Sequence, residues 1–106
     1  MSAQHDKFAI IEQYCDNNGW DGFSIDRRKD IGDWTFEIAI LFGRGVWGPT
    51  LTVTGHRVRW AASTSIPFNT FTNAEELSAA MERAFEKIKK AYDKPINRLA
   101  RHYELK

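Results

Sequence analysis

The chain has 106 residues, of which 42% are apolar and 27% are charged, and its formal net charge is only +1. This length and apolar content suit one globular domain with its own core, and they exclude a disordered linker. The single cysteine, Cys15, excludes an internal disulfide, and no apolar run approaches the ~18 residues that a membrane helix needs. The opening MSAQHDK is too polar for a secretory signal. We therefore expect one compact, soluble, cytoplasmic domain over residues 1–106 that does not bind membranes.

Charge is divided unevenly along the chain. Residues 1–42 carry eight carboxylates against four cations, whereas residues 83–106 carry eight cations against three carboxylates. Such a division suits binding to a charged partner surface. It equally suits neutralisation of one half of the chain by the other, so both interpretations stay open.

A helix is the first predicted element. Residues 4–17 place apolar side chains at helical spacing, namely Phe8, Ile11, Tyr14 and Cys15. The pair Asn18-Gly19 should end this helix, because both residue types tolerate a left-handed backbone.

Alternation with a period of two follows the helix. It predicts a short strand near 23–26, a turn at 29–32 and a long strand over 34–42. The run LTVTGHRVRWAAS, residues 51–63, keeps this period if Gly55-His56 is a two-residue hairpin turn. Two faces of the hairpin then result, an apolar one and a polar one: Leu51, Val53, Val58 and Trp60 against Thr52, Thr54, Arg57 and Arg59.

A long helix is predicted for the last part of the chain. Thr72 or Asn73 can cap it, with Glu75 or Glu76 reaching back. Its apolar stripe consists of Leu77, Met81, Phe85, Ile88 and Tyr92. Pro95 should break the helix, and a shorter helix through Ile96, Leu99 and Tyr103 should follow. The expected fold class is α+β: an antiparallel sheet of three to four strands with an N-terminal helix and one long C-terminal helix (broken near Pro95) packed on one face, in the order α-β-β-β-β-α-α.

The segment FGRGVWGPT, residues 42–50, contains the glycine spacing GxGxxG. A dinucleotide-binding loop requires a helix after the glycines, because helix amides hold the phosphates. Here Pro49 and a strand follow, so the segment is predicted to connect two strands. Trp47 then either packs on the core or projects beside Arg44 as an anchor for a partner, and both alternatives stay open.

Catalytic and metal-binding motifs are weak. DNNGWDG, residues 16–22, fails as a calcium loop because Arg27 stands where a bidentate carboxylate is required. We expect no metal and no cofactor, and we expect that the protein is not an enzyme. A small enzyme without a recognisable motif is the further alternative.

Six cations recur at helical intervals near the end of the chain: Arg83, Lys87, Lys90, Lys94, Arg98 and Arg101. They form either an ordinary solvated helix face or a line of positive charge that follows a phosphate backbone. The order of helix, antiparallel strands and helix is similar to that of double-stranded RNA-binding domains. Glu75 and Glu76 stand where that family would place lysines, so no binding residue is carried over.

In size and in its lack of a catalytic motif, the chain is similar to the small inhibitors that phages and mobile elements encode against host nucleases. The leading hypothesis is therefore a non-catalytic binding protein that acts by protein–protein contact, as an inhibitor or adaptor of a nucleic-acid-processing complex. Its predicted partner-binding residues are Arg44, Trp47, Arg57 and Arg59. Direct nucleic-acid binding through the six C-terminal cations is the alternative, and the open sheet face is also compatible with a homodimer.

Overall fold

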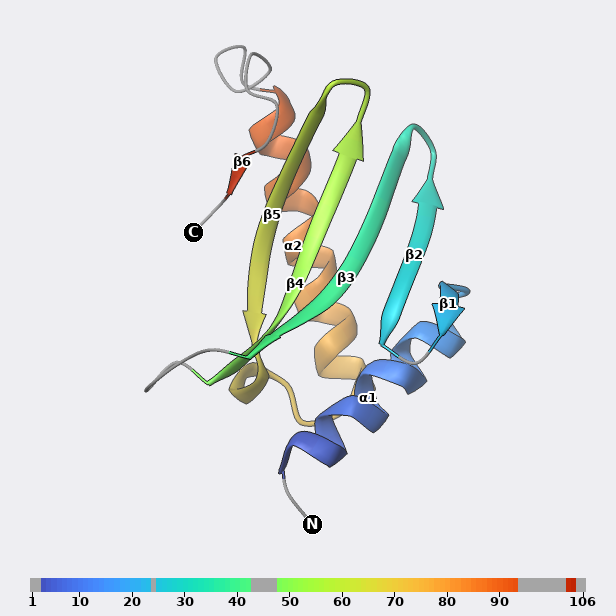
Figure 1. The fold of residues 1–106 in the computed structure, drawn as a ribbon, viewed down its shortest axis with the longest axis vertical. Coiled ribbons are helices and arrows are strands. Elements are labelled where there is room, and N and C mark those ends of the chain that lie inside the picture. The colour runs from blue at the N-terminus through green and yellow to red at the C-terminus, as the bar shows by residue number, and fades with distance from the viewer. Residues whose placement is uncertain (1–2, 24, 43–47, 94–102, 105–106) are drawn as a thin grey trace.

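One sheet with two α-helices on one side makes up the fold of the residues that the computed structural model describes, which are 3–23, 25–42, 48–93 and 103–104 (Figure 1). The elements are α1 (Ala3–Asn17), β1 (Asp21–Phe23), β2 (Asp26–Ile31), β3 (Trp34–Phe42), β4 (Pro49–Arg57), β5 (Trp60–Pro67), a 3-10 turn (Phe68–Thr70), α2 (Ala74–Asp93) and β6 (Tyr103–Glu104). Strands β1 to β5 pair antiparallel in sequence order, and β6 pairs parallel with β5. The α+β class is confirmed, with five antiparallel strands instead of three to four.

The helices cover one face of the sheet, and the core lies between the two layers. Buried apolar side chains on the helix side of β3 to β5 include Phe36, Ile38, Leu51, Val53 and Ile66. In Figure 1 the strands β3 and β4 pass in front of α2, so the view is onto the uncovered face. We call this uncovered side the open face; it consists of every second residue of the five strands, starting from Asp21, Asp26, Thr35, Thr50 and Ala61.

The end of α1 is confirmed at the predicted place. Gly19 has a φ of +71°, a left-handed conformation that suits glycine. The backbone N–H of Trp20 donates to the carbonyl of Cys15 at 3.0 Å, and the N–H of Asn18 donates to the carbonyl of Tyr14 at 3.1 Å. These bonds satisfy carbonyl groups that the end of a helix leaves unpaired.

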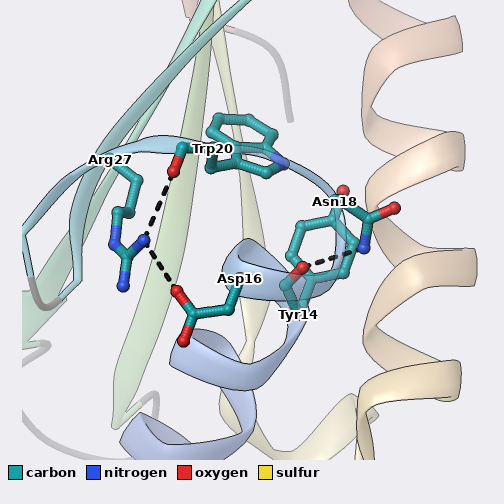
Figure 2. A network of polar contacts seen from close by, with 5 residues as sticks. All are labelled: Tyr14, Asp16, Asn18, Trp20 and Arg27. Atoms are coloured by element: carbon teal, nitrogen blue, oxygen red, sulfur yellow. Dashed lines mark hydrogen bonds and ion pairs between the residues drawn. The ribbon is translucent and has the colours of Figure 1, made fainter.

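Polar contacts then join the end of α1 to β2 (Figure 2). The Nη1 of Arg27 donates to Oδ1 of Asp16 at 3.0 Å and to the carbonyl of Trp20 at 3.3 Å. Lys29, two residues further along β2, donates to the carbonyl of Asn18. Because Arg27 and Lys29 alternate with the residues of the open face, this side of β2 is used to hold α1.

The predicted hairpin turn at Gly55-His56 is wrong. Strand β4 continues through both residues, and Arg57 pairs with Trp60 across a two-residue turn at 58–59. A Cβ added at Gly55 would lie 2.7 Å from Cγ2 of Ile88, well inside contact distance. Glycine is therefore needed here because α2 approaches β4 closely, and it does not mark a turn.

Helix α2 begins with the predicted cap. The backbone N–H of Glu76 donates to Oδ1 of Asn73 at 2.8 Å, while Oε1 of Glu76 accepts from the N–H of Thr72 at 2.9 Å. The hydroxyl of Thr72 also donates to Oε1 of Glu76, and this bond, together with the one from the Thr72 N–H, lowers the pKa of the Glu76 carboxyl. Neither α1 nor α2 is long and apolar enough to span a membrane.

The end of α2 agrees only in part with the prediction. The helix ends at Asp93, and residues 94–102, which include the predicted break at Pro95, lie outside the described part of the chain. The prediction that a helix continues through Tyr103 is wrong, because Tyr103 belongs to β6 and pairs with Ala62 of β5. The backbone N–H and C=O groups at the outer edge of β5 can hydrogen-bond with another strand. A helix at Tyr103 would not provide that pairing.

Candidate binding site at the β4–β5 turn

Three aromatic rings meet at the end of the sheet where β4 turns into β5. Trp34 from β3, Trp60 from β5 and Tyr92 from α2 contact one another edge to face, with ring centroids 5.2 to 5.8 Å apart. Each such pair contributes about 0.5–1.5 kcal/mol beyond its buried area. Both tryptophans are buried, so the rings fix the base of the hairpin to the end of the helix.

Arg57 lies against this aromatic cluster. Its guanidinium carbon is 4.6 Å from the ring centroid of Tyr92 and 5.5 Å from that of Trp34, which is cation–π geometry. Its Nη2 is also 3.4 Å from Oδ2 of Asp33. The Asp33 side chain is 84% exposed, so the aromatic contacts stabilise Arg57 more than the ion pair does.

The predicted position of Arg57 on the polar face is wrong. The prediction placed a turn at Gly55-His56, and this turn would put Arg57 in the following strand, on the same face as Thr52 and Thr54. Because β4 runs on without interruption, Arg57 shares the helix side with Leu51 and Val53. Thr52 and Thr54 do lie on the open face, as predicted.

The tip of the hairpin consists of Val58 and Arg59. Val58 is 89% exposed, which is unusual for a β-branched apolar residue, and it contradicts the prediction that Val58 faces the core. Arg59 is exposed and has a φ of +59°. A side chain in this left-handed region costs ~1–2 kcal/mol relative to ordinary backbone, so the surrounding packing must hold it there.

A hollow lies beside the tip. It has a volume of about 510 Å³ and is lined by His56, Arg57, Arg59, Trp60 and Ala61. On its open-face side, Nε2 of His56 is 3.5 Å from Oε2 of Glu37. The site therefore offers guanidinium donors next to apolar surface, a combination suited to a carboxylate and an apolar side chain on one partner.

Of the four predicted partner-binding residues, only Arg57 and Arg59 lie in the described part of the chain. Arg44 and Trp47 lie outside the described residues, so whether Trp47 belongs to the core or the surface stays a prediction. The strand ends beside them, Phe42 and Pro49, pair with each other at the opposite end of β4 from Arg57. Nine residues of strand separate the two ends by about 26 Å.

The C-terminal cations are also divided. Arg83, Lys87 and Lys90 are exposed on α2, where they line a shared hollow with Glu82 and Glu86. The described part of this surface thus carries both signs of charge. Lys94, Arg98 and Arg101 lie outside the described residues.

Sequence reasoning named Arg59 as a partner-binding residue but placed it within a strand, so it missed that Arg59 lies with Val58 at the tip of a hairpin. Val58 and Arg59 lack the glycine, asparagine or aspartate that usually marks a two-residue turn. The sequence did offer one signal for this turn. If Gly55 is taken as a strand residue, one strand continues through Arg57, and the turn then falls at residues 58–59.

Metal and thiol chemistry find no support in the described residues. No three side chains among their His, Cys, Asp and Glu lie close enough together to hold a metal ion. Cys15 is buried, and burial raises the pKa of its thiol to about 11.

Comparison of the chain with protein-family models, curated proteins and solved structures found no match.

Proposed function

We propose that this protein is a non-catalytic binding protein that contacts a protein partner through the β4–β5 turn. The observation that carries the proposal is the tip itself, where Val58 is 89% exposed and Arg59 is held in a left-handed conformation. Glycine adopts this conformation without the steric cost that a side chain adds. Strained backbone that is kept in place by rigid packing is typical of binding sites.

The packing beneath the tip supports this role. Trp34, Trp60 and Tyr92 hold the hairpin base, so little conformational entropy is lost when a partner orders the turn. Arginine is among the residues that most often dominate binding energy at interfaces, especially beside apolar contacts. Arg57 is already engaged with the aromatic cluster, which leaves Arg59 and Val58 as the contact residues.

The biological setting is a further part of the proposal. The small size of the chain and its lack of a catalytic motif suit a cytoplasmic inhibitor or adaptor of a nucleic-acid-processing complex, of the kind encoded by phages and mobile elements. The loop that contains Arg44 and Trp47 stays a separate predicted contact.

Affinity capture from a cell extract tests the proposal. The full chain serves as bait beside two variants with the same change of charge, Arg59→Glu at the tip and Arg83→Glu on α2. We expect the wild type and Arg83→Glu to capture the same partner protein, and Arg59→Glu to lose it. Treatment with nuclease should not change this capture. Capture that nuclease abolishes, and that Arg83→Glu rather than Arg59→Glu weakens, would overturn the proposal in favour of nucleic-acid binding.

A further inference from the structure

The open face carries an excess of negative charge among its described residues. Four exposed carboxylates project from β1 to β3, against one guanidinium and no lysine: Asp21, Asp26, Asp30 and Glu37 against Arg28. Strand pairing places Asp21, Arg28 and Glu37 in one row across three neighbouring strands. This concentration on one face does not follow from the net charge of the chain, which is +1.

Exposed apolar side chains lie on the same face. Phe23 is 86% exposed and Leu41 is 56% exposed, and the third large apolar side chain exposed in the described residues is Val58 at the hairpin tip. Phe23 pairs with Asp26, and Leu41 pairs with Thr50, which places each of them on the open face by strand register. A partner that covered Phe23 and Leu41 with apolar side chains would remove this exposed apolar surface from water, which favours binding.

The half of the open face formed by β4 and β5 carries no carboxylate, lysine or arginine among its described residues. Threonines at every second position of β4 lie beside small residues of the neighbouring strands, such as Ala39 and Ser65. Strands β3, β4 and β5 have 9, 9 and 8 residues, whereas β2 has 6 and β1 has 3. At ~3.3 Å per residue and ~4.8 Å between strands, they present roughly 550 Å² on one side, which approaches the share of each partner in a standard protein interface. Small side chains also allow another backbone to approach closely.

We infer that the open face binds a positively charged protein segment that also carries apolar side chains. Lysine or arginine of the partner would pair with the carboxylates on β1 to β3, and its apolar side chains would cover Phe23 and Leu41. A second copy of this chain is disfavoured as the occupant, because it would bring two negatively charged faces together. The inference rests on the proposed function in that the partner is a protein, but it concerns a different surface from the hairpin tip.

A defined probe tests this surface without the natural partner. The isotope-labelled full chain is titrated with a capped hexapeptide of alternating lysine and leucine, and separately with its glutamate–leucine counterpart, while amide shifts are followed by NMR. We expect the lysine peptide to shift amides of β1 to β4, including Glu37 and Leu41, with affinity that falls as salt is raised. The glutamate peptide should cause no shift. Equal binding of both peptides, or shifts confined to α2, would overturn the inference.

A matched pair of variants locates the contact. Ala39 in β3 and Ala79 in α2 are both exposed, but only Ala39 lies on the open face. Ala39→Lys should weaken lysine-peptide binding about five-fold or more, as expected for a new like charge at the centre of the contact, whereas Ala79→Lys should not. Equal effects of the two variants would contradict the inference, as would self-association of the wild type that Ala39→Lys abolishes, since the occupant would then be a second copy.

The hairpin variant separates this inference from the proposed function. Arg59→Glu should abolish capture of the natural partner and leave lysine-peptide binding unchanged. Loss of peptide binding in Arg59→Glu, with the fold intact by circular dichroism, would place the peptide at the tip and overturn the open-face site.

Discussion

Gly55 lies where α2 packs directly against β4. A Cβ at this position would lie 2.7 Å from Cγ2 of Ile88 and 2.9 Å from Cε1 of Phe36. Neither neighbour can move freely, because both are fully buried. The absence of a side chain at Gly55 therefore sets the distance between the two layers.

Replacing Gly55 with alanine should destabilise the protein. The added methyl group would force Ile88 and Phe36 apart, and such overpacking costs about 1–3 kcal/mol. The free energy of unfolding, measured by urea denaturation, checks this, with Ser65→Ala on the exposed side of β5 as a control. An unchanged stability in Gly55→Ala would mean that α2 does not pack against β4 as described.

Arg59 should behave in the opposite way. Arg59→Gly removes the left-handed strain, so we expect a stability equal to the wild type or higher by up to about 1 kcal/mol, since glycine also loses more entropy on folding. Thermal unfolding measures this change. A clear loss of stability would show that Arg59 serves the fold, and it would remove the main reason for placing a binding site at the tip.

Arg57 is expected to stabilise the fold through the aromatic rings. Arg57→Met keeps an unbranched apolar stem but loses the guanidinium and its cation–π contacts, which should cost about 1 kcal/mol. Asp33→Asn removes only an exposed ion pair and should change stability by less than about 0.5 kcal/mol. Equal losses in the two variants, measured by urea denaturation, would show that the ion pair is the dominant contact.

Helix α1 contributes two buried ionisable side chains at its last turn. Burial raises the pKa of Cys15 from 9.0 to about 11 and that of Tyr14 from 10.0 to about 12. The folded state therefore holds both protons more tightly than the unfolded state does. Their contribution to stability is complete below about pH 9 and is lost as the pH rises through the folded values.

Alkaline unfolding tests the position of α1. The free energy of unfolding should fall steadily as the pH is raised from about 9 to 11, and Cys15→Ala should reduce the slope because one of the two groups is gone. Urea denaturation at a series of pH values provides the measurement. A slope that Cys15→Ala leaves unchanged would mean that the thiol is not buried in the core.

Local signals explain which elements could be predicted from the sequence. The end of α1 and the start of α2 depend on neighbouring residues, Asn18-Gly19 for α1 and Asn73 with Glu76 for α2, so both positions are predicted correctly. The second half of β2, whose sequence is DRRKDI, was predicted to be a turn because polar residues occupy both faces of this strand. Arg27 meets α1 while Arg28 lies on the open face, and no period in hydrophobicity reports that difference.

The candidate site was less predictable because it joins distant parts of the chain. Trp34, Trp60 and Tyr92 come from three elements, and only the register of β3 to β5 together with the direction of α2 brings them together. Reading Gly55-His56 as a turn assigned Arg57 to the following strand and so placed it on the wrong face of the sheet. One incorrect turn therefore changed the predicted site more than it changed the predicted fold.

At the scale of the whole molecule, the uneven charge of the sequence becomes a difference between surfaces. Carboxylates from the first half of the chain collect on the open face, while the described cations of α2 alternate with Glu82 and Glu86. The hairpin tip lies at the end of the sheet, next to the row that joins Thr35, His56 and Ala61 on the open face. One large partner can therefore contact both the tip and the open face.

The affinity of the captured partner for Arg59→Glu, compared with its affinity for the wild type, is the most direct test of the proposed binding site. Interface arginines of this kind contribute 2 kcal/mol or more when they dominate binding, so we predict a dissociation constant at least ~30-fold higher for the variant, with its thermal unfolding unchanged. An equal dissociation constant for the two proteins, with the variant fully folded, would show that the β4–β5 turn is not the binding site.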